Sequence, residues 1–170
     1  MTSAAEIARE MADEVVRTRR TVAALGAAIE AAHVRASPAL ARAVQAEEGL
    51  YQRIADEFGL LTSAEAGRRL GSRSKAARNL ALSARRDGQL LALRRGRYDL
   101  FPGFQFDDHG ARPVVAALIA LGEEHERSEA GLVQWLMAPT TYLDGLRPVD
   151  VIDDPDRLLS VAREAFGVQW

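Results

Sequence analysis

The segment from Thr62 to Gly88 constrains the fold most, because it predicts two short helices joined by a tight turn. Thr62 and Glu65 have the spacing of a capping box, in which the Thr62 hydroxyl accepts from the Glu65 amide and the Glu65 carboxylate reaches back. Gly71 is expected to end this first helix. A second helix is predicted over about residues 74–87, and Gly88 follows its end.

The second helix is predicted to have an apolar side and a basic side. The spacing of a buried stripe is followed by Ala77, Leu80, Ala81 and Ala84. The opposite side carries Lys75, Arg78, Leu82 and Arg85, with Asn79 and Arg86 at its edges. A short helix, a tight turn and a longer helix with a basic free side are typical of a helix-turn-helix, whose second helix enters the major groove of DNA.

A basic β-hairpin is predicted after this helix. Leu90–Leu93 and Tyr98–Phe101 are the expected strands, and the sequence Arg94-Arg95-Gly96-Arg97 lies between them as the tip. A basic hairpin in this place resembles the wing of a winged helix-turn-helix. Its arginines are expected near phosphates or in the minor groove.

Two kinds of DNA contact follow from this interpretation. Base-edge contacts, in which arginine pairs with guanine and asparagine with adenine, are predicted for Arg73, Ser74, Lys75, Arg78 and Asn79. Contacts to backbone phosphates are predicted for Arg85, Arg86, Arg94, Arg95 and Arg97. The alternative is a solvated basic face with no ligand.

Charge is distributed unevenly along the chain, although the formal net charge is only -2. Residues 60–106 hold nine arginines, Lys75 and three acids, which gives +7. Residues 107–170 hold five arginines and twelve acids, which gives -7. A basic centre followed by an acidic end suggests two surfaces with different partners. The alternative is that the two regions neutralise each other within one fold.

The amino-terminal residues predict two long helices. From Ser3 to about Arg35 a heptad pattern is formed by Ala8, Met11, Val15, Thr18, Val22, Leu25, Ile29 and Ala32. Branched residues at one heptad position favour a parallel two-stranded coil, so this helix is predicted to form a homodimer; packing on its own chain is the alternative. A further helix is expected from Ser37-Pro38 to Phe58, with a buried side made of Leu50, Tyr51, Ile54, Ala55 and Phe58.

Beyond Phe106, prolines and caps mark a series of short helices. Pro113 is expected to open a buried helix that runs through Leu121 and is closed by Gly122. Ser128 is a possible cap for the next helix. Later helix starts are predicted at Pro148 and Pro155, and the last helix shows an apolar side of Leu158, Leu159, Ala162 and Phe166. These helices predict a compact bundle.

The order of motifs from Glu129 to Phe166 resembles the toxin-binding domain of the Xre/MbcA/ParS-type antitoxins. The matching elements, over about 38 residues, are Trp135-Leu136, Pro139, the turn Leu143-Asp144-Gly145-Leu146-Arg147-Pro148, Val149–Ile152 and Pro155–Phe166. A second glycine often occupies the position of Asp144 in that family. The family also usually carries an Xre-type helical DNA-binding domain, whereas the centre of this chain is predicted to be winged.

The resemblance implies a protein partner. Antitoxins of this family neutralise RES-domain toxins, which consume NAD, by packing their carboxy-terminal module on the toxin. The residues that this implies for the toxin-binding surface are Tyr142, Leu143, Leu146, Arg147, Asp150 and Trp170. Trp135 is a further candidate, for which packing in the core is the favoured alternative.

Several other classes of function are not supported by the sequence. The chain has no cysteine, only three histidines, and no nucleophile elbow, Walker-type loop or dinucleotide fingerprint, so no enzyme, cofactor or metal site is predicted. The Asp107–His109 and Glu123–Glu126 runs are interpreted as solvated turns, and Gly67, Gly71 and Gly88 as helix punctuation. The polar start and the absence of a long apolar run predict a soluble cytoplasmic protein without a membrane span.

The sequence therefore predicts a mainly α-helical protein in three parts. Residues 1–46 form a dimerisation segment, residues 47–106 a winged helix-turn-helix with a small β-hairpin, and residues 107–170 a small helical toxin-binding bundle. The expected function is that of a type II antitoxin that neutralises a RES-type toxin and represses its own operon by DNA binding. The alternatives are a standalone transcriptional regulator or nucleoid-associated protein, and a structural adaptor without DNA contact.

Overall fold

The computed structural model describes residues 9, 11, 13–22, 38–74 and 76–167. It divides into two compact units, Met1–Ala46 and Glu47–Trp170, which are described separately. Much of the predicted heptad pattern lies outside the described residues, as do Lys75 and Trp170. Homodimer formation through the first helix therefore stays a prediction. Among the described residues, no helix has the length and apolar character needed to cross a membrane.

The first unit contains helical residues 13–22 and the start of helix α2 (Pro38–Glu57). Val22 of the heptad pattern is exposed, and so are Leu40 and Val44 of α2. The start of α2 at Pro38 is confirmed, and the helix ends one residue before the predicted Phe58. Of its expected buried side, Tyr51 and Ile54 are buried, Leu50 and Phe58 are half-buried, and Ala55 is exposed, so the prediction for Ala55 was wrong.

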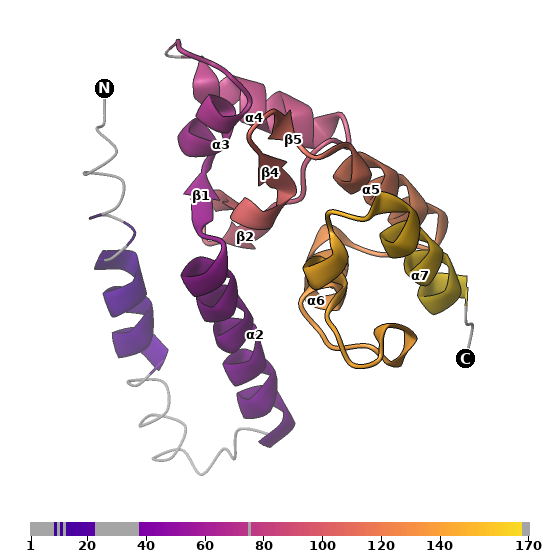
Figure 1. Ribbon diagram of the computed structural model, residues 1–170. Coiled ribbons are helices and arrows are strands. Elements are labelled where there is room, and N and C mark those ends of the chain that lie inside the picture. Colours follow the sequence, from indigo (N-terminus) through magenta and orange to yellow (C-terminus); the bar gives the residue numbers. More distant parts are fainter. Residues whose placement is uncertain (1–8, 10, 12, 23–37, 75, 168–170) are drawn as a thin grey trace. The chain divides into compact units, whose positions relative to one another are not determined.

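The second unit contains the element order of a winged helix-turn-helix (Figure 1). After α2 follow β1 (Leu60–Thr62), α3 (Ser63–Arg69), α4 (Ala77–Arg86), β2 (Leu93–Arg95) and β3 (Tyr98–Pro102). The three strands form an antiparallel sheet in the order β1-β3-β2, with Thr62 opposite Leu100 and Leu93 also opposite Leu100. A mainly helical fold with a small β-hairpin is thus confirmed. Strand β1 was not predicted, because its three residues are shorter than any alternating pattern.

The capping box at the start of α3 is formed as predicted. The Glu65 amide donates to the Thr62 hydroxyl oxygen at 3.3 Å, and the Thr62 amide donates to the Glu65 carboxylate at 2.8 Å. Thr62 is both the last residue of β1 and the N-cap of α3. Two otherwise unpaired backbone donors are satisfied in this way, which fixes where the strand stops and the helix begins.

Helices α3 and α4 approach each other closely at Gly67. A Cβ atom added to this glycine would lie 1.8 Å from the backbone oxygen of Ala77. Gly67 is therefore an interior contact of α3, and its interpretation as helix punctuation was wrong. Gly71 and Gly88 do follow helix ends, both with positive φ, as predicted. The core beneath this contact consists of Ala66, Ala81, Ala84, Leu90, Ala92, Phe101 and Phe106.

The predicted strand at Leu90–Leu93 begins only at Leu93. The reason is that side chains, not a neighbouring strand, satisfy the backbone of the preceding residues. The buried Gln105 accepts from the Leu91 amide at 2.8 Å and donates to the Leu91 carbonyl at 2.9 Å. The Ala92 amide donates to the Glu129 carboxylate at 2.7 Å. Buried backbone groups need partners, and these two side chains remove the need for a ladder.

The remainder of the second unit is a group of short helices after a small hairpin. Its elements are η1 (Gly103–Gln105), β4 (Phe106–Asp107), β5 (Gly110–Ala111), α5 (Pro113–Glu124), α6 (Glu129–Leu136), η2 (Thr141–Leu143), η3 (Pro148–Val151) and α7 (Pro155–Gly167). Starts at Pro113, Pro148 and Pro155 are confirmed, and Ser128 caps α6 by accepting from the Gly131 amide at 3.1 Å.

One helix end in this group differs from the prediction. Helix α5 continues past Gly122 to Glu124. A Cβ atom on Gly122 would lie 2.8 Å from the Leu132 side chain, so the glycine serves the close packing of α5 on α6. In α7, Leu158, Ala162 and Phe166 are buried as predicted, Leu159 is half-buried, and Val161 joins the buried side.

Candidate nucleic-acid interface

Helix α4 presents a buried alanine face and an exposed polar face. Ala77, Ala81 and Ala84 are buried, as predicted. Leu80 is 41% exposed, so its place in the buried stripe was wrong. Leu82, expected on the free side, is half-buried against the core. The buried face of α4 is thus turned from Leu80 toward Leu82.

The segment before α4 is a turn, although the second helix was predicted from residue 74. The Ser74 hydroxyl accepts from the Ala76 amide at 3.1 Å, and the Ser74 carbonyl accepts from the Ala77 amide at 3.2 Å. Serine side chains compete in this way with the helical backbone pattern. Arg73 and Ser74 are therefore exposed in the turn between α3 and α4, just ahead of the helix.

The exposed face of α4 carries donors that the fold does not use. Arg78, Asn79 and Arg86 are exposed. Within residues 38–74 and 76–167, the side chains of Arg73 and Arg78 have no ion-pair or hydrogen-bond partner. Arg86 makes one long contact, from Nη2 to the Ser83 hydroxyl at 3.5 Å. These guanidinium groups and the Asn79 amide are consequently available to an acceptor outside the protein.

The wing is a tight hairpin in which Gly96 has a φ of 58°. Arg95 pairs with Tyr98 across the two strands, so Gly96 and Arg97 form the tip. Arg94 is 64% exposed and is held at its base by Asp99, 3.0 Å from its Nη1 atom. Arg97 is exposed and donates to its neighbour's hydroxyl, with Nε 2.9 Å from the Tyr98 oxygen.

Arg95 fixes the wing to α2, although it was predicted to contact phosphate. Its Nη2 atom lies 2.9 Å from a carboxylate oxygen of Glu48, and its guanidinium lies 5.0 Å from the centre of the Tyr51 ring. The Tyr51 hydroxyl in turn donates to the Arg94 carbonyl at 2.9 Å. Burial raises the pKa of Tyr51, and the carboxylate of Glu47 adds to this. These contacts between the wing and α2 give Arg95 a structural role.

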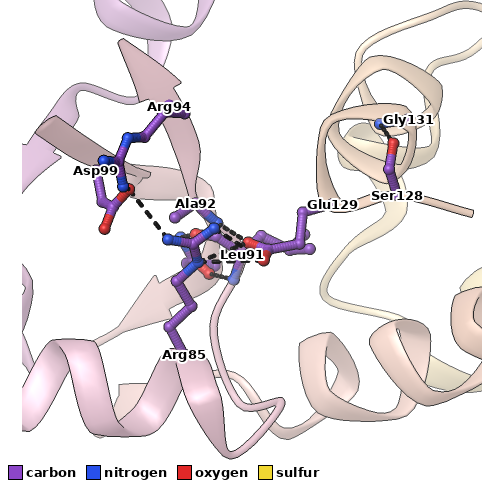
Figure 2. Close-up of polar contacts among 9 residues, drawn as sticks. Arg85, Leu91, Ala92, Arg94, Asp99, Ser128, Glu129 and Gly131 are labelled. Atoms are coloured by element: carbon purple, nitrogen blue, oxygen red, sulfur yellow. Dashed lines mark hydrogen bonds and ion pairs between the residues drawn. The ribbon is translucent and has the colours of Figure 1, made fainter. Parts of the chain in front are cut away.

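Arg85 is likewise engaged inside the fold, in contrast to its predicted phosphate contact. Its Nε and Nη2 atoms lie 3.1 Å from the Glu129 carboxylate, and its Nη1 atom lies 3.0 Å from Asp99 (Figure 2). Burial disfavours the charge, but hydrogen bonds and the charges of Glu129 and Asp99 outweigh it and raise the pKa of Arg85. The guanidinium group of Arg85 is therefore paired with carboxylates inside the protein.

An open groove runs beside the exposed face of α4. It has a volume of about 710 Å³ and is lined by Asn79, Leu82, Arg85, Arg86, Asp99, Glu123 and Glu129. Its polar and basic lining residues come from α4, whereas its carboxylates come from β3, α5 and α6. Because carboxylates repel an anionic ligand, such a ligand is expected to contact the edge of this groove rather than to be enclosed by it. In the part of the chain that the structure describes, no group of three or more His, Asp or Glu side chains could hold a metal ion.

The residues implied for toxin binding divide into exposed and internal ones. Tyr142 and Leu146 are 45% and 48% exposed. Leu143 is buried, so its assignment to a contact surface was wrong; it anchors the turn from beneath. Arg147 pairs with Asp150 at 2.7 Å and with Glu57 at 2.8 Å.

Two further interactions involve residues that were considered for toxin binding. The hydrogen bond from Arg147 lowers the pKa of Asp150. Trp135 is half-buried, and its ring centre lies 4.9 Å from that of Phe166, which agrees with the packing alternative.

The acidic partners of Arg85 and Arg95 were not predicted from the sequence. Glu129 lies 44 positions after Arg85, and Glu48 lies 47 positions before Arg95. Glu129 follows the cap Ser128, where an acidic residue has an ordinary explanation in the helix dipole. No local pattern ties either acid to its arginine, so only the tertiary fold reveals these pairs.

Comparisons with known proteins leave the family of this chain open. No family model matches the sequence, and no curated protein matches it. Among solved structures, the NMR structure of Rv2175c is similar, with a TM-score of 0.54 over 67% of this chain and 83% of that chain. The two sequences are 18% identical. The likeness shows that the two proteins share a fold.

Proposed function

We propose that this chain binds duplex DNA, with α4 in the major groove and the wing beside it. The observation that carries the proposal is the exposed face of α4, where Arg78 and Asn79 project and Arg78 has no partner among the described residues. Arginine pairs with guanine and asparagine with adenine in the major groove. The preceding turn adds Arg73, and the wing adds Arg94.

The internal arginines sharpen this proposal. Arg85 and Arg95 are held by carboxylates, so they fix α4 and the wing in place. The contacts to phosphate then fall to Arg73, Arg86, Arg94 and Arg97. We expect the logarithm of the binding constant to fall with the logarithm of salt concentration with a slope of about -3 to -5, which corresponds to that number of phosphate contacts.

Fluorescence anisotropy of a labelled duplex of mixed sequence, titrated with the full chain at several salt concentrations, measures this slope. Binding with the expected slope supports the proposal. Absence of binding at low salt, or binding that does not depend on salt, contradicts it. The same experiment separates DNA-binding regulators and antitoxins from a structural adaptor.

We further propose that the chain is the antitoxin of a type II pair and neutralises a RES-domain toxin in the cytoplasm. The specific observation is the turn that carries Tyr142 and Leu146. Thr140 holds it, because its amide donates to the Leu146 carbonyl at 3.1 Å and its carbonyl accepts from the Gly145 amide at 2.9 Å. A rigid turn with two exposed apolar side chains is suited to a protein contact, and tyrosine is frequent at such contacts. A standalone transcriptional regulator is the alternative.

Replacing Tyr142 and Leu146 together by alanine is expected to abolish neutralisation while DNA binding is retained. The measurement is the cellular NAD level when a RES-domain toxin encoded beside this chain is co-expressed. Leu40→Ala with Val44→Ala is the matched control, because it removes two exposed apolar side chains from α2. Equal protection by both double variants would contradict this contact surface. A toxin that stays active with the unmodified chain would contradict the antitoxin role.

A further inference from the structure

Glu129 joins three elements through one carboxylate. It is the first residue of α6, and its oxygens accept from Nε and Nη2 of Arg85 on α4. One of them also accepts from the Ala92 amide, directly before strand β2 of the wing. Figure 2 shows the Arg85 side chain extending from its helix toward both Glu129 and Asp99. The carboxy-terminal helices are thus tied to the DNA-reading helix and to the base of the wing.

Every nitrogen of the Arg85 guanidinium is engaged by these carboxylates. Nε and Nη2 face Glu129, and Nη1 faces Asp99. An arginine recognises a carboxylate and a phosphate with the same bidentate geometry. Arg85 lines the groove beside Asn79 and Arg86, which face outward from α4. Glu129 therefore occupies the donors that a DNA phosphate at this groove would require.

The groove also shows why the restraint is specific to Glu129. Glu123 also lines the groove, but in the described part of the chain its carboxylate has no ion pair or hydrogen bond with Arg85. Asp99 holds Arg85 from the wing and shares its carboxylate with Arg94. Only Glu129 brings the charge from α6, outside the elements that form the winged helix-turn-helix.

We propose that Glu129 is an internal competitor of DNA: its carboxylate holds Arg85 away from phosphate and so makes DNA affinity depend on the position of α6. The proposal rests on DNA binding through α4. In this arrangement a displacement of α6 exposes one additional cation beside the reading helix. Because α6 belongs to the segment proposed to contact a protein partner, that partner and DNA are coupled through a single ion pair.

Glu129→Gln tests this coupling. The glutamine oxygen keeps an acceptor for the Ala92 amide, whereas the charge that holds Arg85 is removed. We expect the slope of binding against salt to become steeper by about 0.9 and affinity near 0.1 M salt to rise roughly fivefold, the effects of one added phosphate contact. Glu123→Gln is the matched control, since it makes the same charge change in the same groove without freeing Arg85. Arg85→Gln combined with Glu129→Gln is expected to return the slope to that of the unmodified chain.

Two results would overturn the proposal. The first is an equal change of slope in Glu129→Gln and Glu123→Gln, which would show a general charge effect. The second is a flatter slope in Arg85→Gln alone, which would show that Arg85 already contacts phosphate. If the unmodified chain binds DNA and either result is obtained, only the coupling fails; if it binds no DNA, the proposed function fails and the coupling with it. Should Glu129→Gln prove unfolded by circular dichroism, Glu129→Asp serves instead, because its shorter side chain draws the carboxylate away from Arg85; an unchanged slope in this variant equally refutes the restraint.

Discussion

Replacing Gly67 by alanine is expected to lower the free energy of unfolding by about 3 kcal/mol, the upper end of the typical cost of overpacking, because the neighbouring atoms belong to the backbone. The added Cβ atom would meet the backbone oxygen of Ala77 at 1.8 Å and its carbonyl carbon at 2.3 Å. Neither atom is the end of a flexible side chain, so α3 and α4 must separate. Denaturant unfolding followed by circular dichroism measures the change.

Gly49→Ala is the matched control for this substitution. Gly49 lies inside α2, and a Cβ atom there would meet only the end of the Arg53 side chain, at 3.4 Å. Alanine in a helix interior is favoured over glycine by about 0.5–1 kcal/mol, so this variant is expected to be slightly more stable. If Gly67→Ala unfolded at the same denaturant concentration as the unmodified chain, the close contact between α3 and α4 would be refuted.

The double replacement of Arg78 and Asn79 by alanine is expected to remove sequence preference and most of the specific affinity. Each lost base contact corresponds to about 1–3 kcal/mol of discrimination, so the pair amounts to roughly 2–6 kcal/mol if the effects add. Stability should change little, because both side chains are exposed. Selection of bound sequences from a random duplex library, for the variant and the unmodified chain, measures the preference.

Glu123→Ala with Glu124→Ala is a control for this pair, because it alters two exposed polar residues at the end of α5. It should leave the selected sequence unchanged. An identical selected sequence from the Arg78→Ala, Asn79→Ala variant would show that another surface reads the bases.

Local signals in the sequence predicted several helix boundaries, both in the basic centre and in the carboxy-terminal helices. The capping box at Thr62 and Glu65, the glycines after α3 and α4, and the prolines at the starts of α5 and α7 act within one turn of the chain. Their effects do not depend on the rest of the fold. For this reason the helix-turn-helix and the order of the carboxy-terminal helices could be inferred without a structure.

Long-range pairs explain what the sequence did not predict. Leu90–Ala92 have the composition of a strand, but Gln105 bonds to the backbone of Leu91 and Glu129 to that of Ala92. Leu80 matches the helical spacing of a buried residue, but α4 packs with Leu82 toward the core and leaves Leu80 exposed. Arg85 and Arg95 look like free cations until Glu129 and Glu48 are placed beside them. The division into three parts at residues 46 and 106 stays a prediction.

The structure changes which of the predicted residues belong to the candidate site. Arg73, Ser74, Arg78, Asn79, Arg86, Arg94 and Arg97 are exposed around α4 and the wing. Arg85 and Arg95 instead hold these two elements in place. Arginine is suited to both tasks, because the same planar fork binds carboxylate and phosphate. Counting basic residues therefore overestimates how many of them are exposed to an external partner.

Contact between the exposed face of α4 and DNA can be tested by the backbone amide shifts of the full chain on addition of a duplex. We expect the largest shifts at Arg73, Ser74, Arg78 and Asn79 and at the wing tip, with small changes along α7. Shifts confined to the carboxy-terminal helices, or no shifts at a DNA concentration that saturates the anisotropy signal, would contradict it.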